Sequence, residues 1–230
     1  QAFIGSGDIF AQEPDELIPT AEGYGGTDAQ FASITTRYGH FYVNRQARKV
    51  LMFSSQIEEL SSIGMEKWFL DNIPYVLEGY GVDLDQNTLA FTDAPTDMFG
   101  FTAAYDPKYK RIILTKRERV PTALFLTEYN AGTLTVSDNN FYAGLVQLGF
   151  DNTEYFQDGG WTMSYYPEIK VWGSRHSYKP RLYAYSTSEY FSLVNSADVS
   201  AGQVWEHSDE DAPGSFFGIT NNFEFEYIDN

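Results

Sequence analysis

Histidine is the side chain best suited to metal binding and to proton transfer near neutral pH, and the sequence has three of them. They lie at positions 40, 176 and 207, so no two have the short spacing of a local metal-binding motif. The chain has no cysteine, which removes thiolate ligands, disulfides and thiol catalysis together. We interpret His40, His176 and His207 as hydrogen-bonded or surface residues, and their convergence in space stays open.

Oxygen ligands could instead come from the segment DLDQN at 83–87, which is similar to the start of a calcium-binding loop. That loop type needs glycine at its sixth position and a carboxylate at its twelfth, where this chain has Thr88 and Ala94. The sequence therefore excludes an EF-hand. It favours a polar turn here, with a looser oxygen-ligand loop left open.

Other local catalytic motifs are missing. The glycine-rich segments 5–7 and 23–27 lack the Gly-Lys-Ser/Thr ending of a phosphate-binding loop, so we interpret them as turns. No Gly-x-Ser-x-Gly motif of a serine hydrolase occurs. With 32 acidic residues, a pair of glycosidase carboxylates stays open, but no motif nominates them. The sequence thus predicts no catalytic residue, no cofactor-binding residue and no metal ligand.

The net charge of −17 argues against binding nucleic acid through its phosphates. No apolar run is long enough for a membrane span, so no membrane anchor is expected. The acidic run at 209–211 is typical of a solvated loop. It could also line a channel through which DNA passes, since a negative wall disfavours adhesion of the duplex.

The elements that would position any site are mostly strands. The chain has 17 Tyr, 18 Phe and 4 Trp, residues that suit pleated surfaces and cross-strand pairs. Residues 1–30 are rich in turn formers and predict an irregular segment with one short strand near 9–10. A capping box at 55–58 and apolar spacing predict one helical insertion at about 55–72, where Trp68 and Phe69 would anchor it to a sheet. Strands are predicted at 31–35, 40–43, 49–53, 88–92, 101–105, 111–116, 123–128, 134–137, 161–165, 170–174, 181–186, 190–194, 203–207 and 223–228.

Three hairpins align without gaps: VNRQARKVL at 43–51, YDPKYKRII at 105–113 and YYPEIKVWG at 165–173. Each has an apolar or aromatic strand end, then a polar turn, then a basic residue that opens the returning strand. The turns begin at Asn44, Asp106 and Tyr166, so the period is ~60 residues, a length that suits a four-stranded propeller blade.

Several segments resemble the propeller region of the tail stabilisation proteins, of the muzzle or nozzle type, of crAss-like and related gut phages. The resemblance covers residues 5–228 and is carried by structural turns and aromatic anchors: GMEKWF at 64–69, YDPKYKRIILT at 105–115, WTMSY at 161–165, HSYKP at 176–180, VWEH at 204–207, GSFFG at 214–218 and FEFEY at 223–227. It implies an architectural role at the distal end of a short tail, where the protein retains or passes the genome. It supplies no catalytic residues. Members of that family are much longer than 230 residues, and the chain starts at Gln1, so we expect a fragment or a shortened relative.

We therefore expect an all-β chain, with residues 1–230 as a single β-propeller-like domain; a sandwich or a barrel is the alternative. The expected function is that of a non-enzymatic structural component of the phage virion tail, assembled in the host cytoplasm. Its expected partners are other copies of itself and other tail proteins. The alternative is a carbohydrate-active propeller, either a glycoside hydrolase or a glycan-binding module.

Overall fold

The computed structural model describes residues 26–193, 204–207, 215–216 and 219–220. They form mostly antiparallel strands with two short α-helices, which confirms the all-β class. The α-helices are α1 (Glu66–Asn72) and α2 (Ala123–Ala131), and the 3₁₀ helices are η1 (Gln30–Ala32), η2 (Val76–Tyr80) and η3 (Leu84–Gln86).

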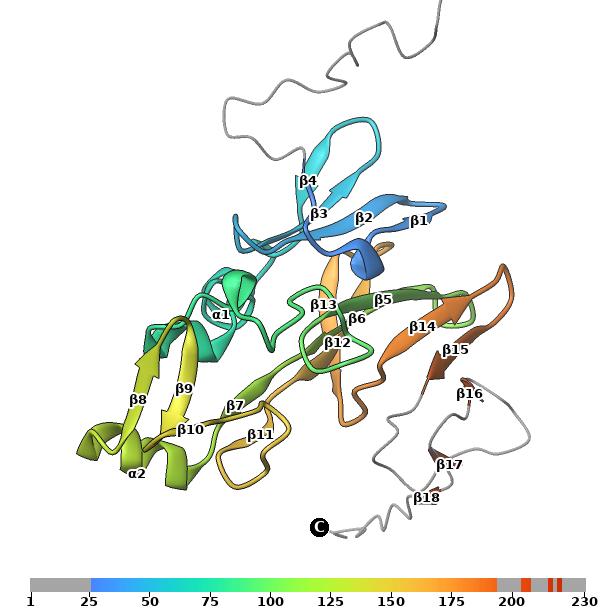
Figure 1. The fold of residues 1–230 in the computed structure, drawn as a ribbon. Helices are drawn as coiled ribbons and strands as arrows, with labels where there is room; N and C mark the ends of the chain where they lie inside the picture. The colour runs from blue at the N-terminus through green and yellow to red at the C-terminus, as the bar shows by residue number, and fades with distance from the viewer. Residues whose placement is uncertain (1–25, 194–203, 208–214, 217–218, 221–230) are drawn as a thin grey trace, which may run out of the picture.

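Three antiparallel sheets are arranged in layers (Figure 1). The first sheet is a meander of β1 (Ile34–Thr36), β2 (Gly39–Asn44), β3 (Lys49–Phe53) and β4 (Ile57–Glu59). The central sheet has the order β13-β12-β6-β5, from β5 (Gly100–Asp106), β6 (Arg111–Arg117), β12 (Trp161–Tyr166) and β13 (Val171–His176). The C-terminal sheet contains β14 (Leu182–Tyr185), β15 (Tyr190–Leu193) and β16 (Val204–Glu206), and β14 lies beside β5. A short pair, β17 (Ser215–Phe216) with β18 (Ile219–Thr220), follows.

The main core lies between the first and the central sheet. Side chains alternate along a strand, so Phe101 and Ala103 of β5 face this core, whereas Thr102 and Ala104 face the C-terminal sheet. Phe69 of α1 is fully buried against Trp161 and Trp172, with ring centroids 6.2 and 4.6 Å away. The prediction that Phe69 anchors a helix onto a sheet is confirmed. Trp68, packed edge-on against Trp161 at 4.8 Å, does the same.

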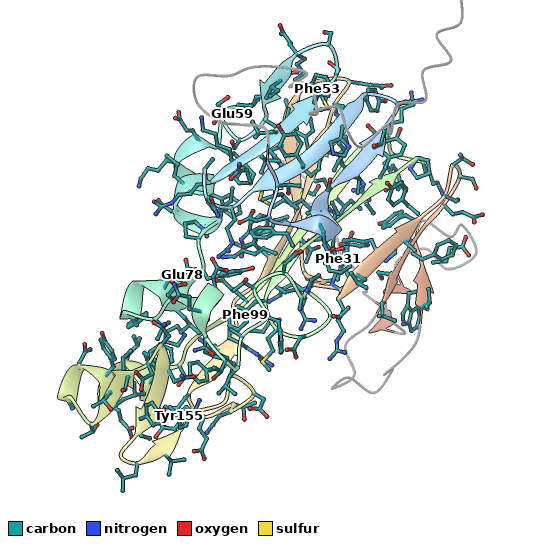
Figure 2. All side chains as sticks on the ribbon, turned by 45° about the horizontal axis from the view of Figure 1, so that its top comes forward. Phe31, Phe53, Glu59, Glu78, Phe99 and Tyr155 are labelled. Carbon is teal, nitrogen blue, oxygen red and sulfur yellow. The ribbon has the colours of Figure 1, made fainter. Side chains whose placement is uncertain are left out.

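Residues 118–160 form an insertion between the adjacent strands β6 and β12. Its base is closed by the pairing of β7 (Arg119–Pro121) with β11 (Phe156–Asp158), and a small sheet and α2 lie beyond (Figure 1). An aromatic cluster fills it, in which the Phe125 ring lies 5.0 Å from Phe141 and 5.2 Å from Tyr80 of η2. Tyr155 lies among these side chains in Figure 2. The small sheet contains β8 (Leu134–Ser137), β9 (Asn140–Ala143) and β10 (Val146–Gln147).

The three aligned hairpins have the same turn geometry. In each, strand residues at the turn start pair with the residue five positions later, which leaves a four-residue loop. The last loop residue is left-handed in every copy: φ is 57° at Arg48, 51° at Lys110 and 52° at Lys170. The second and third copies, however, lie in one sheet, because β6 pairs with β12. The interpretation that each of the three hairpins belongs to its own propeller blade is therefore wrong. No sheet closes into a barrel within the described residues.

Three predicted elements are also wrong. Residues 57–59 form β4 instead of a helix, because they pair with the edge of β3 and the backbone N–H of Leu60 donates to Val50. The helical insertion at 55–72 therefore shrinks to α1. Residues 123–128 belong to α2 and not to a strand, since Thr122 caps the helix and Gly132 ends it with φ 73°. Residues 88–92 form turns, not a strand.

Some predictions fall outside the described residues, namely the strands near 9–10 and at 223–228 and most of the irregular segment at 1–30. No helix in the described part of the chain is long and apolar enough to cross a membrane.

Candidate functional site

All three histidines are hydrogen-bonded to hydroxyl groups, as the sequence predicted. His40 bonds with Ser33 and Thr35 at 3.1 and 3.0 Å. His176 bonds with Ser164 at 2.5 Å, and His207 with Ser192 at 2.6 Å. Two of the three do converge, because the Tyr178 ring lies 5.0 Å from His176 and 5.4 Å from His207. No group of three or more ligating side chains that could hold a metal ion occurs in the part of the chain that the structure describes.

His176 and His207 belong to a polar layer between the central and the C-terminal sheet. Burial is the main cause that lowers the pKa of each to about 4, and the Arg111 charge adds to it. His207 stacks on Tyr190 with ring centroids 4.4 Å apart. Both imidazoles are therefore neutral at pH 7 and serve as hydrogen-bonding partners.

Arg111 and Asp106 form an ion pair in the same layer. Arg111 Nε donates to Asp106 Oδ2 at 2.9 Å, and the Asp106 side chain is fully buried. Burial alone would lower the pKa of Arg111, but the Asp106 carboxylate outweighs it and the pKa is raised. Above this pair, the hydroxyls of Thr115 and Thr162 bond each other at 2.8 Å, and Thr115 bonds Tyr183 of β14 at 2.8 Å. These hydrogen bonds hold the central sheet and the C-terminal sheet together, so we assign them a structural role.

A second buried ion pair lies on the core side of the central sheet. Lys116 Nζ donates to Glu118 at 2.7 Å and to the carbonyls of Asn72 and Pro74 at 2.9 and 2.8 Å, and Glu118 accepts from Val76 N–H at 3.0 Å. Burial lowers the pKa of Lys116 and raises that of Glu118, and each partner opposes the other's shift. In the sequence, these residues lie in the charged run 116–119, which is typical of a surface, so nothing local predicts their burial.

The predicted polar turn at 83–87 is confirmed as η3, and Asp83 accepts a hydrogen bond from Asp85 N–H. Asp85 of this turn pairs with the Arg45 guanidinium at 2.6 Å. Arg45 also pairs with Glu78 and Asp28, which lie outside the turn, at 3.2 Å each. Burial raises the pKa of Glu78. Burial would also raise the pKa of Asp85, but its hydrogen bonds outweigh it and the pKa is lowered.

The strand β13 is an open edge of the central sheet. Within the described residues it pairs only with β12. Gly173, Ser174 and Arg175 are exposed, and Val171 keeps 41% of its surface accessible. An unpaired edge presents N–H and C=O groups that can accept another strand.

Next to this edge the turns of the second and third hairpins come together in a hairpin-tip surface. Glu168 is its centre, and it accepts hydrogen bonds from Tyr38 at 2.9 Å and Arg37 at 3.2 Å and pairs with Lys110 at 3.3 Å. The hydrogen bond from Tyr38 is the main cause that lowers the Glu168 pKa. We define the hairpin-tip surface by its exposed residues, which combine positive charge with apolar area: Arg37, Lys108, Tyr109, Lys110, Glu168, Ile169 and Lys170.

The remaining predicted features lie largely outside the described residues, namely the glycine-rich segment 5–7, the acidic run 209–211 and most of 23–27. Of the last, Thr27 is described, and its hydroxyl donates to the Val43 carbonyl at 2.6 Å.

No family model matches the sequence, and a search of curated proteins finds no match to it.

Proposed function

We propose that this chain is a non-enzymatic structural subunit of a phage virion tail, which works in a symmetric complex with other copies of itself and with other tail proteins. The resemblance to tail stabilisation proteins supports this role. The resembling segments contribute to folding here, since 105–115 forms most of the β5–β6 hairpin and Trp161 packs on Trp68. In this proposal the protein helps to retain or pass the genome, touches DNA only in passing, and is assembled in the host cytoplasm.

The open edge at β13 is the observation that carries the proposal. Soluble monomers protect such edges with charge, proline, short strands or a covering segment. Here a six-residue edge strand has no proline and pairs on one side only within the described residues, and Arg175 is its single Lys or Arg. A partner strand in an assembly would satisfy its free backbone groups.

The solution mass of the full chain at increasing concentration tests the proposal. We expect association into a defined oligomer, visible as rings by electron microscopy. A monomer at every soluble concentration, or turnover of polysaccharides by the isolated chain, would contradict it.

The second candidate is a carbohydrate-active protein, and the carboxylates around Arg45 favour it. Opposite pKa shifts at Glu78 and Asp85 are the kind of difference that separates an acid from a base in glycosidases. Because Arg45 bonds both carboxylates, a substrate would have to displace it. If the chain hydrolyses a glycan, Glu78→Gln and Asp85→Asn should each abolish turnover.

The propeller arrangement is a finer part of the proposal. The first, central and C-terminal sheets would be its blades, with further blades from other copies or from further chain. Image classes with a central channel would support this arrangement, and a compact sandwich would contradict it.

A further inference from the structure

The two faces of the open edge at β13 differ in chemistry. In the pairing with β12, Arg175 lies opposite Met163, and Trp172 lies opposite Tyr165. Met163 and Tyr165 face the main core, so Arg175 and Trp172 lie on the side of the first sheet. Lys170 lies on that side too, because its Nζ bonds Glu58 of β4 at 2.6 Å. Val171 lies opposite Tyr166 and faces the other side.

Arg175 supplies a positive charge that could pair with a carboxylate of another strand. It is exposed, and no ion pair of Arg175 occurs among the described residues. A strand added beside β13 would therefore meet a cation and an indole on one face and the apolar Val171 on the other.

Charge is distributed unevenly along this chain. Residues 1–25 contain five carboxylates and residues 182–230 contain nine, and neither segment has a lysine or arginine. These two segments account for −14 of the net charge of −17. All 15 basic residues lie between positions 37 and 181, so the basic open edge and the acidic chain ends have complementary charges.

One acidic segment also has the pattern of a strand. Residues 223–228 have the sequence FEFEYI, in which aromatic and acidic residues alternate at first with period two. If they are extended, Glu224 and Glu226 share one face, and Phe223, Phe225 and Tyr227 share the other. The two faces of such a strand complement those of β13: the carboxylates would lie beside Arg175, and the aromatic rings would lie beside Val171.

We propose that residues 223–228 of a second copy of this chain add as a strand to β13 and so link the copies head to tail. The inference rests on the proposed assembly role and names its interface. Such a contact joins two different surfaces, so it generates a closed ring where the rotation permits. Within one copy, β14 lies beside β5, which is at the opposite edge of the central sheet from β13.

Charge reversal tests the pairing in the full-length chain by sedimentation. Arg175→Glu, and separately the pair Glu224→Lys with Glu226→Lys, should each raise the dissociation constant for self-association about tenfold, because attraction becomes repulsion. Combining all three changes in one chain should restore association. Lys67→Glu on α1 is the matched control, since this lysine is 90% exposed and far in sequence from the edge, and it should have no effect. Failure of the combined variant to restore association would overturn the pairing.

Disulfide trapping tests the geometry, because the chain has no other thiol. A mixture of Ser174→Cys and Phe225→Cys chains should form mixed disulfide dimers on mild oxidation, since neighbouring strands bring Cβ atoms within bonding range. Equal dimerisation of Ser174→Cys alone would show β13 pairing with itself, and an intrachain disulfide in the double variant would show pairing within one copy. Either result overturns the inference.

The outcomes also separate the inference from the proposed assembly role. If the native chain associates but mixed dimers do not form, the inference fails and the assembly role stands. If the native chain stays monomeric, the assembly role itself fails.

Discussion

Arg48, Lys110 and Lys170 occupy the same left-handed position at the end of three four-residue turns. This conformation costs a residue with a Cβ roughly 1 kcal/mol, and glycine avoids that cost. A basic residue was expected to open each returning strand. Lys49 and Arg111 do so, but Lys170 lies in the loop, at the strained position that Arg48 and Lys110 hold in the other two turns. The similarity of the three hairpins is thus a similarity of loop conformation.

Replacing Arg48 by glycine should stabilise the protein. Arg48 is exposed, so relief of the left-handed strain should exceed the extra entropy of the unfolded chain, with a gain of about 0.5 kcal/mol. Urea denaturation measures the gain. Arg48→Ala is the control, because it removes the same side chain but retains the strained Cβ; an equal gain in both variants would contradict the explanation.

Stability should fall on acidification from about pH 6.5 to pH 4. In that window the His207 imidazole takes up a proton in the unfolded chain, where its pKa is ordinary, but not in the folded chain, where the pKa is about 4. The unfolded state therefore binds more protons, and the free energy of unfolding declines as the pH falls. Denaturation curves at pH 7 and pH 4.5 should show a smaller decline for His207→Gln than for the native chain. An identical decline would contradict the shifted pKa.

At the scale of elements, the hairpins of the first and central sheets were predictable because alternating apolar residues flank short polar turns. The β4 strand was not, since its pairing depends on the edge of β3 and its sequence also fits a helix. For α2 the signals were present in Thr122 and Gly132, but its aromatic and leucine content favoured a strand. The buried pair of Lys116 and Glu118 has no local signal, because only α1 and the segment after it bring the partners of Lys116 to the sheet.

Lys116→Met should destabilise the protein by about 3 kcal/mol. The change leaves the buried Glu118 carboxylate without its cation and removes a donor from two carbonyls, of which that of Asn72 still accepts from Trp161 Nε1–H at 3.3 Å. Thermal and urea denaturation measure the loss. The variant with Glu118→Gln added should be more stable than Lys116→Met alone, because the unpaired charge is then gone while Val76 N–H keeps an acceptor. A further loss in the double variant would show that the ion pair is not what the site depends on.

At the scale of the whole molecule, the central sheet has an apolar side and a polar side. A large cluster that includes Phe41, Phe101 and Leu114 joins it to the first sheet. Towards the C-terminal sheet, the buried apolar cluster among the described residues consists of Ala104, Ile113 and Tyr190, and hydroxyl and ion-pair contacts add to it. The layers should therefore differ in how readily they separate.

Hydrogen exchange should show this difference. We expect the amides of β14 and β15 to exchange faster than those of β6 and β12, because opening the polar side exposes less apolar surface. Tyr183→Phe, which removes the hydroxyl that bonds Thr115, should accelerate exchange in β14 and β15 and leave β6 unchanged. Uniform exchange across all three sheets would show a single cooperative unit instead.

The insertion at 118–160 has a consequence for the evolution of this architecture. Its two ends are held side by side by the β7–β11 pair, and the strands that it connects, β6 and β12, are already neighbours. A tight turn could replace everything beyond that pair without altering the order of the central sheet. Homologues should thus differ most in length and sequence between positions 122 and 155, where genetic drift or recombination can exchange one appendage for another.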